Sequence, residues 1–518
     1  MAAAGPSLGA LAEAGFLVKT LTRRGLIAPG PPVRVARQLG QLRRWGFGLA
    51  GELRQAAARE PARIAVIDEN GPRTYAELLD RSERLARALA VGPGDRVGVL
   101  CRNSATMIET LVAVTMTGAD SVLLNTGLSG PQLATVARDQ GLRRIVHSAE
   151  FDLGELGCGI LEGDLDELIA ATPAGRFEPP AAPGRTIVLT SGTTGVPKGA
   201  CRPTPGGFGP LASIIDRIPL RAGVRVMIAA PLFHTWGFAG LQIALALRAT
   251  VVLRRRFDPA TVLQTLDEHR CTALIAVPVM LQNLMEQPTT DARPPLSVVA
   301  VSGSALPGGL ATRFMDRFGD ILYNLYGSTE ASWASIAVPA DLRAAPGTAG
   351  RPPHGTRIAV LDEAGREVPA GEPGRLFVGN EMLFEGYTNG GSKEVRDGLL
   401  ATGDVGHLDE AGRVFVDGRE DDMIISGGEN IFPSEVENLL ADLPEVLEVA
   451  VIGVPDDAYG QRLAAYLVLH PGAALDEEKV RDHVRLNRAR FCVPRDVVFL
   501  PALPRNATGK ILTRDLPR

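Results

Sequence analysis

From position 63 onward, short apolar runs alternate with longer amphipathic segments. Ile64–Ile67 predicts a strand, and Thr74, followed three residues later by Glu77, has the spacing of a helix capping box. Leucines then recur at helical intervals. Repeated alternation of this kind predicts an α/β fold with largely parallel strands. Further strands are expected at Arg96–Leu100, Thr186–Thr190, Val224–Ala229, Thr250–Leu253, Ala273–Val277, Ser297–Val301 and Ile321–Leu325.

The pattern changes at the Gly- and Pro-rich stretch Pro346–Pro353, after which strands are shorter and turns more frequent up to about Gly418. Strands at Val449–Val454 and Leu463–Leu469 and a helix near Pro433–Leu440 predict a last, small α+β unit. A chain of 518 residues exceeds one compact core. We predict a large domain of layered, mostly parallel sheets at residues 51–418, with a β-rich subdomain, and a small mobile domain at residues 422–518.

Residues 1–50 form a basic N-terminal arm, in which Lys and Arg greatly outnumber acidic residues and Trp45 and Phe47 are interspersed. A basic segment with such side chains could lie on an anionic membrane surface. Because Gly and Pro interrupt any sustained helical face, we favour a helical arm packed on the large domain, with its arginines in solvent.

Composition narrows the class of protein. Hydrophobic residues make up 45% and charged residues 22% of the chain, as in ordinary soluble globular proteins, and the net charge of −5 argues against a nucleic-acid partner. Five scattered cysteines without a CxxC pair indicate a reducing compartment. We expect a cytoplasmic protein, and leave open both a homodimer and contact of the arm with the inner face of the membrane.

The strongest chemical signal follows the strand that ends at Thr190. Its ten residues are Thr190, Ser191, Gly192, Thr193, Thr194, Gly195, Val196, Pro197, Lys198 and Gly199. Glycines let backbone N–H groups approach phosphate oxygens, the hydroxyls add donors, and the lysine adds positive charge. The lysine is followed by glycine, so the string is not a Walker A motif. It predicts a phosphate-binding loop rather than a surface turn.

This string resembles the AMP-binding signature of the adenylate-forming superfamily, which includes acyl-CoA synthetases, peptide-synthetase adenylation domains and luciferases. Further motifs of that superfamily follow in the expected order: Phe233-His234, Tyr326-Gly327-Ser328-Thr329-Glu330, Thr402-Gly403-Asp404, Gly418-Arg419 with Asp421, and Pro504–Lys510. The resemblance covers roughly residues 50 to 518. It implies an enzyme that uses ATP, Mg²⁺ and CoA to activate a carboxylic acid as an acyl-adenylate.

The resemblance also implies roles in the nucleotide site. Tyr326 would stack on adenine and Thr329 would contact the α-phosphate. Glu330 would bind Mg²⁺, because a carboxylate repels a triphosphate unless a cation lies between them. Asp404 would accept hydrogen bonds from the ribose hydroxyls, and Arg419 would contact the same sugar. The remaining candidates are Gly303, Ser304 and Ala305 beside adenine, Asn324 at its amino group, and Gly327.

Lys510, in the small domain, resembles the catalytic lysine of the first half-reaction. An ammonium that donates to both the carboxylate and the α-phosphate would lower their repulsion and stabilise the transition state. The site would then assemble across a mobile interface with a hinge at residues 419–421, centred on Asp421. Rotation about this hinge would open a channel for the CoA thiol. The CoA-binding candidates are Ser426, Gly427 and Gly428.

His234 would lie near the acyl carboxylate and organise it for thiol attack, although an isolated histidine in an apolar setting is often a packed core residue. The segments Gly427–Ile431 and Pro231–Phe238, with the basic arm, resemble bacterial fatty-acyl-CoA synthetases. We therefore predict a medium- or long-chain fatty-acid–CoA ligase with small-molecule partners. The alternatives are an aryl- or short-branched-acid CoA ligase, an acyl-AMP ligase that loads a carrier protein, and a catalytically silent adenylate-binding protein at the membrane.

Overall fold

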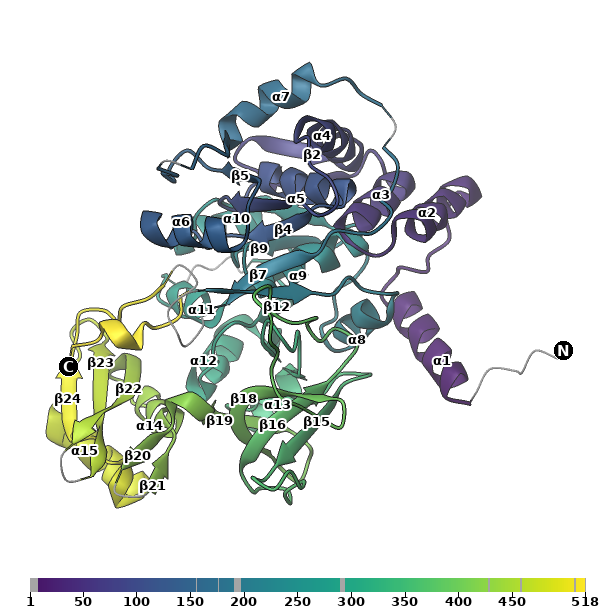
Figure 1. Cartoon of the computed structure of the whole chain (residues 1–518). Coiled ribbons are helices and arrows are strands. Elements are labelled where there is room, and N and C mark those ends of the chain that lie inside the picture. The colour runs from purple at the N-terminus through teal and green to yellow at the C-terminus, as the bar shows by residue number, and fades with distance from the viewer. Residues whose placement is uncertain are drawn as a thin grey trace.

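The computed structural model describes residues 8–154, 156–175, 177–190, 197–288, 294–426, 429–456, 459–506 and 509–517. Three helices precede the first sheet (Figure 1): α1 (Leu8–Arg23), α2 (Pro32–Trp45) and α3 (Leu49–Arg59). The Arg24 guanidinium donates to the carbonyl of Ile215 at 2.7 Å, and the rings of Phe16 and His354 stack with centroids 3.7 Å apart. The arm is therefore packed on the large domain. Within the described residues, no helix is long and apolar enough to cross a membrane.

The first sheet has six strands in the order β6-β5-β3-β4-β7-β8, parallel except for the last pair. Its strands are β3 (Arg96–Leu100), β4 (Asp120–Leu123), β5 (Arg144–His147), β6 (Gly159–Leu161), β7 (Thr186–Thr190) and β8 (Lys198–Arg202). The connecting helices are α4 (Tyr75–Ala88), α5 (Ala105–Thr117), α6 (Gly130–Asp139) and α7 (Leu165–Ala171). The capping box before α4 is confirmed: Thr74 N donates to Glu77 Oε2 at 2.7 Å, and Glu77 N donates to Thr74 Oγ1 at 3.2 Å.

The second sheet has eight strands in the order β14-β13-β12-β11-β9-β10-β1-β2, with an antiparallel strand at each edge. They are β1 (Ile64–Asp68), β2 (Gly71–Thr74), β9 (Arg225–Ile228), β10 (Thr250–Val252), β11 (Ala273–Ala276), β12 (Val298–Val301), β13 (Leu322–Tyr326) and β14 (Ser335–Ala337). Its helices are α8 (Gly209–Arg217), α9 (Thr235–Ala246), α10 (Pro259–Glu268), α11 (Pro278–Met285), α12 (Gly308–Phe318) and α13 (Pro339–Ala344). Parallel strands dominate both sheets, as predicted.

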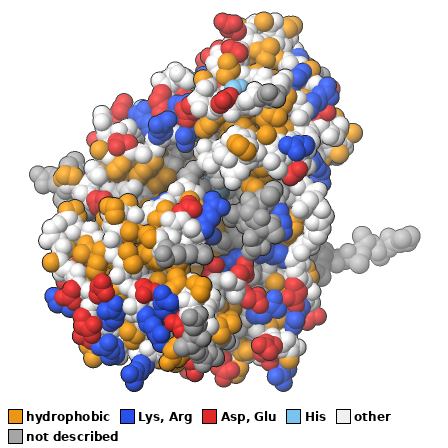
Figure 2. Space-filling model, turned by 60° about the vertical axis from the view of Figure 1, so that its left-hand side comes forward, with side chains coloured by type: hydrophobic (Ala, Val, Ile, Leu, Met, Phe, Trp, Pro, Cys, Tyr) orange, Lys and Arg blue, Asp and Glu red, His pale blue; other side chains and the backbone are white. Residues whose placement is uncertain are grey.

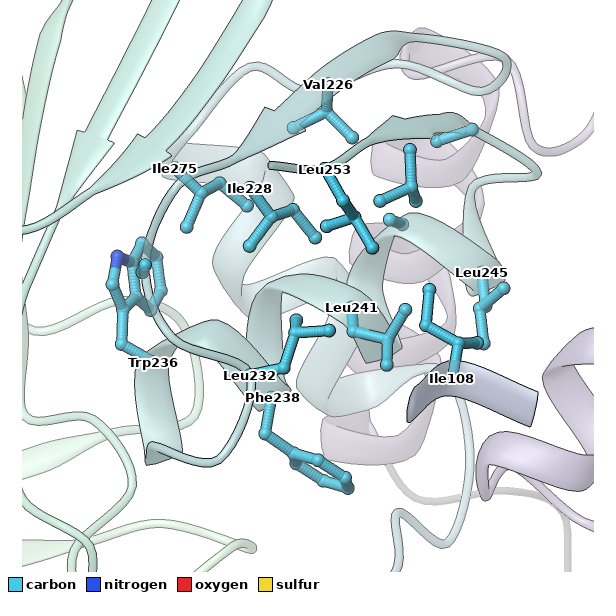
Figure 3. Packing of buried hydrophobic residues seen from close by; sticks show 14 of the residues in the cluster. Ile108, Val226, Ile228, Leu232, Trp236, Phe238, Leu241, Leu245, Leu253 and Ile275 are labelled. Atoms are coloured by element: carbon cyan, nitrogen blue, oxygen red, sulfur yellow. The ribbon is translucent and has the colours of Figure 1, made fainter. Parts of the chain in front are cut away.

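Helix α9 is central to the core of the large domain. Its Leu241 and Leu245 are buried in one cluster with Ile108 of α5 and with Val226 and Ile228 of β9 (Figure 3). Burial of each such side chain contributes about 1.5–3 kcal/mol relative to exposure. One face of α9 is therefore fixed by the core, and this leaves its other face available to form a wall.

The β-rich subdomain follows, as five antiparallel strands: β15 (Arg357–Leu361), β16 (Gly374–Gly379), β17 (Val395–Arg396), β18 (Leu399–Leu408) and β19 (Val414–Arg419). In the β18–β19 pairing, Asp404 stands opposite Arg419. Strand pairing therefore brings together two residues that lie in separate sequence motifs.

The small domain has its own sheet and hydrophobic core. Its elements are β20 (Ile424–Ser426), β21 (Glu429–Ile431), α14 (Pro433–Ala441), β22 (Val446–Asp456), β23 (Gly460–Leu469), α15 (Glu477–Asn487) and β24 (Asp496–Phe499). In Figure 2, acidic and basic side chains are interspersed along the lower margin of the molecule. The prediction of an α/β protein with a large domain and a smaller C-terminal domain is confirmed. The predicted limit at residue 50 falls inside α3.

Candidate active site

A cavity of about 270 Å³ brings together distant parts of the chain. The N-terminal segment contributes Phe47 and Glu52, helix α9 contributes one long wall, and the small domain contributes Asn506 and Lys510. Residues 328 and 329, from the loop after β13, also line it. The cavity therefore joins the predicted nucleotide motifs to a region that carries none of them.

The wall formed by α9 follows from its spacing. Thr235, Ala239, Gln242, Ile243 and Ala246 all line the cavity and are separated by three or four residues, or are adjacent, so they share one helix face. The helix rises roughly 1.5 Å per residue, so this wall is about 16 Å long. The cavity is thus elongated, with Thr235 at one end and Ala246 at the other.

The strands that flank the predicted phosphate loop are in place. Thr190 pairs with Lys198 across β7 and β8, and Thr190 Oγ1 donates to the Lys198 carbonyl at 3.3 Å. Lys198 Nζ lies 5.7 Å from the centroid of the Tyr387 ring. Ser191, Gly192, Thr193, Thr194 and Gly195 lie outside the described residues, so their roles stay predictions.

Glu330 is buried in a polar setting. Its Oε1 accepts a hydrogen bond from Tyr387 Oη at 2.8 Å. The Glu330 carboxylate also interacts electrostatically with the Arg202 guanidinium. Burial lowers the pKa of Arg202 to about 10, an effect that the Glu330 charge opposes. The described residues hold no group of three or more metal-ligating side chains. A single carboxylate still fits Mg²⁺, which commonly takes one or two carboxylates and completes its shell with phosphates and water.

Tyr326, Asp404 and Arg419 meet in one cluster. Tyr326 Oη donates to Asp404 Oδ2 at 2.5 Å, and Arg419 Nη1 donates to Asp404 Oδ1 at 3.3 Å. Burial raises the pKa of Asp404, while the Tyr326 hydroxyl and the Arg419 charge act to lower it. Burial and the nearby Asp404 charge raise the pKa of Tyr326. The proposed ribose-binding carboxylate is therefore held in a fixed orientation by two donors.

The residues predicted beside adenine lie at the carboxyl ends of β12 and β13. Gly303, which has a φ of +100°, and the exposed Ser304 and Ala305 follow β12, while Asn324 on β13 pairs with Val301. Gly327 is constrained by space, because a Cβ there would lie 2.3 Å from the carbonyl oxygen of Ser332. These segments reach the same edge of the second sheet.

His234 and Thr329 lie at the end of the cavity that Thr235 borders, here called the near end. The hydroxyl oxygens of Thr329 and Thr235 are 2.9 Å apart. The Nε2 atom of His234 is buried and has no hydrogen-bond partner within the described part of the chain. Burial lowers the pKa of His234 to about 4, so its imidazole is neutral at physiological pH. A neutral ring with an unused nitrogen is available to a bound molecule.

Lys510 reaches the cavity from the small domain. Its backbone N–H donates to Asn506 Oδ1 at 2.9 Å, and its carbonyl accepts from Asn506 N at 2.9 Å. The neighbouring Gly509 has a φ of +81°, and a Cβ there would lie 2.4 Å from Val279 Cγ1 of α11. The loop that carries Lys510 thus packs directly against the large domain.

The hinge and CoA candidates lie elsewhere. Asp421 is exposed in a short 3₁₀ turn, Glu420–Asp422, with its Oδ2 3.6 Å from Arg419 Nη2. Ser426 ends β20 opposite Gly460 and is not among the cavity-lining residues. Gly427 and Gly428 lie outside the described residues. The assignments of Asp421, Ser426, Gly427 and Gly428 stay predictions.

Sequence reasoning did not assign Glu52, Phe47, Arg202 or Tyr387 to the site. Arg202 lies four residues after Lys198 on the same strand, so the alternation of side chains was a usable signal. Glu52 stands next to a basic segment, and nothing in its sequence context distinguishes it from a solvated acid. Its position depends on the packing of α3 against α9.

The model for AMP-binding enzymes matches residues 53–388, and the model for the AMP-binding enzyme C-terminal domain matches residues 435–510. The chain belongs to the AMP-binding enzyme family. A feruloyl-CoA synthase from Amycolatopsis sp is 34% identical over 480 residues, which cover 89% of this chain and 97% of that protein. An indoleacetate–CoA ligase from Aromatoleum aromaticum is 33% identical over 488 residues, covering 89% and 96%.

A solved structure of o-succinylbenzoate CoA synthetase from Bacillus subtilis, in complex with its acyl-adenylate intermediate, superposes with a TM-score of 0.81 at 31% identity, covering 90% of this chain and 98% of that one. The prediction of an adenylate-forming enzyme is confirmed, with ATP, Mg²⁺ and CoA as the small molecules that such ligases use. The coarse reaction class, an AMP-forming acid–CoA ligase, is supported as well. These relatives do not support the prediction of a fatty acid.

Proposed function

We propose that this protein is an AMP-forming CoA ligase for an aromatic carboxylic acid. This reverses the order of the predictions above, because the acids named for the three relatives are aromatic and the shape of the cavity agrees with them. The observation that carries the proposal is the elongated cavity along α9. It has His234, Thr329 and Lys510 at one end and fixed aromatic side chains along its walls.

The aromatic walls are rigid. Trp236 Nε1 donates to the Ala276 carbonyl at 3.0 Å, and Trp333 Nε1 donates to Thr356 Oγ1 at 2.9 Å. Phe47 and Phe208 also line the cavity. Their rings meet edge to face, with centroids 4.9 Å apart. Flat walls of fixed orientation favour a planar ring through edge and stacking contacts, whereas a flexible alkyl chain would lose more conformational entropy there.

In the first half-reaction, a carboxylate oxygen of the acid attacks the α-phosphorus of ATP, and the bond to pyrophosphate breaks. The Lys510 ammonium donates to both anions, and the Arg202 guanidinium adds positive charge beside Glu330. Glu330 would hold Mg²⁺, which when bound neutralises phosphate charge. The loop at residues 190–199 would bind the phosphates, and Asp404 and Arg419 the ribose. Holding both reactants in one cavity removes much of the entropic barrier.

In the second half-reaction, the CoA thiolate attacks the acyl carbonyl carbon and AMP leaves. Asn506 and Lys510 line the cavity, so the thiol needs these residues to withdraw. Rotation at residues 419–421 would remove them and bring Ser426 and the glycines after it toward the thiol. The neutral His234 imidazole would then face the acyl carbonyl.

The hinge can be tested at Asp421. Asp421→Pro should slow thioester formation from supplied acyl-adenylate at least tenfold and leave adenylation unchanged, whereas Asp421→Ala should leave both half-reactions unchanged. Equal single-turnover rates for Asp421→Pro and wild type would contradict the hinge assignment.

The test is ATP–pyrophosphate exchange and CoA-dependent thioester formation with cinnamate, 4-hydroxycinnamate and decanoate. We expect both aromatic acids to give a higher kcat/KM than decanoate. A higher value for decanoate would restore the fatty-acid interpretation. Pyrophosphate exchange without thioester formation in the presence of CoA would favour transfer of the acyl group to a carrier protein. If no acid supported pyrophosphate exchange, the proposal of an acid–CoA ligase would be wrong.

A further inference from the structure

The far end of the cavity holds a buried carboxyl group. Glu52, in the first turn of α3, is 4% exposed and lines the cavity. Gln55 Nε2 lies within 3.2 Å of Glu52 Oε2 and also donates to the carbonyls of Leu245 and Ala246, at 3.2 and 3.3 Å. These contacts place Glu52 at the C-terminal end of α9. Thr235 and the reacting groups lie at the other end of the same helix.

A second polar side chain borders the same region. Gln242, which lies on the cavity face of α9 one helical turn before Ala246, donates from Nε2 to the carbonyl of Phe47 at 3.3 Å. That bond leaves its side-chain oxygen available as an acceptor. Neighbouring wall residues, Ile243 and Ala246, are apolar. The far end of an otherwise apolar wall therefore carries one carboxyl group and one carboxamide.

Only one oxygen of Glu52 has a hydrogen-bond partner within the described residues, and the side chain borders the cavity. The described residues give its Oε2 one contact, with Gln55, and give its Oε1 none, while Arg248 acts on it only through its charge. Burial raises the pKa of Glu52 to about 8, so at neutral pH this carboxyl group is mostly protonated and both donates and accepts. A ligand hydroxyl that bonds to the oxygen facing the cavity would gain a hydrogen bond in a largely desolvated setting.

The plain alternative is that Glu52 ties α3 to α9. The structure already assigns that role to Gln55, whose two bonds to carbonyls of α9 need no help from Glu52. We propose that Glu52, together with Gln242, binds a hydroxyl group at the end of the aromatic acid remote from its carboxylate. Glu52 is then a specificity-determining residue, and this inference rests on the proposed function.

The test compares two substrates that differ in one hydroxyl group, 4-hydroxycinnamate and cinnamate. We expect wild type to have the higher kcat/KM for the hydroxylated acid. Glu52→Leu should lower the ratio of the two kcat/KM values about tenfold, the change that corresponds to one lost hydrogen bond to a buried group. Glu52→Gln keeps a donor and an acceptor and should retain most of the ratio, which guards against misfolding of the leucine variant.

Glu437 provides a matched control, because it is a partly buried carboxyl group with a raised pKa in α14, and it does not line the cavity. Glu437→Gln should leave the ratio unchanged. If Glu52→Leu leaves the ratio of the two kcat/KM values unchanged, or lowers kcat/KM equally for both acids, the inference is wrong and the proposed function still holds. A wild-type preference for cinnamate overturns it too. If wild type uses decanoate and neither aromatic acid, the proposed function fails and this inference fails with it.

Discussion

The two ends of the active site are built in different ways. The proposed nucleotide end is made of short contiguous motifs, such as residues 326–330 after β13 and residues 402–404 within β18, whose polar side chains are close in sequence. The acid end is made of side chains from the N-terminal segment and α9 that meet only through packing. On the proposed function, the residues for adenylation therefore lie in short local motifs, whereas the residues that select the acid come together only when distant helices pack.

Loss of the lysine at the boundary of the two ends should have the largest effect. Lys510→Ala should reduce pyrophosphate exchange by about 10²–10³-fold, the loss typical of one charge-stabilising donor. Thioester formation from supplied acyl-adenylate should be largely unaffected. Lys479→Ala, at an exposed lysine of the same domain, is the control. Equal loss in both half-reactions would show that Lys510 is not specific to adenylation.

A change confined to the nucleotide end should raise KM for ATP and leave KM for the acid unchanged. Tyr326→Phe removes the hydroxyl that orients Asp404, and we expect KM for ATP to rise about tenfold, as for one hydrogen bond to a charged group. Tyr323→Phe alters the same strand outside this cluster and should be neutral. A rise in KM for the acid alone would break the division between the two ends.

A change at the acid end should do the opposite. Phe47→Ala removes the edge-to-face contact with Phe208 and opens the cavity wall, so KM for the aromatic acid should rise about 2- to 10-fold, matching a contact of about 0.5–1.5 kcal/mol. Phe16→Ala, also in the arm but stacked on His354, controls for general loosening of the arm. An equal rise in KM for ATP would show that Phe47 acts through overall stability.

The last prediction concerns stability rather than catalysis. The pKa of Glu52 is raised to about 8 in the folded protein, so rising pH ionises this group first in the unfolded chain and favours unfolding. Between about pH 4.5 and 8, the melting temperature of Glu52→Gln should therefore increase relative to wild type as pH rises. Differential scanning calorimetry across this range measures the difference. A constant difference would mean that the carboxyl group titrates normally.

Much of this architecture follows from the sequence. Alternating apolar runs predicted strands such as Arg96–Leu100 at their observed bounds, and the capping box at Thr74 fixed the start of α4. The nucleotide residues could be proposed from the sequence because each motif is short and its chemistry is visible in residue types. The proposed acid pocket could not be, because Glu52 and Gln242 are far apart in sequence and meet only when α3 packs on α9. A long apolar helix such as α9 gives no indication of which face borders a cavity.

Because the N-terminal segment meets α9 away from the nucleotide motifs, sequence changes at this contact and sequence changes in those motifs can occur independently. Phe47 and Glu52 belong to a layer around the cavity, which Asp404 and Arg419, the proposed ribose-binding residues, do not line. Natural variation there can redirect the enzyme toward new acids while its ancestral ATP chemistry is inherited intact. Libraries that randomise this layer are accordingly a direct route to altered substrate preference.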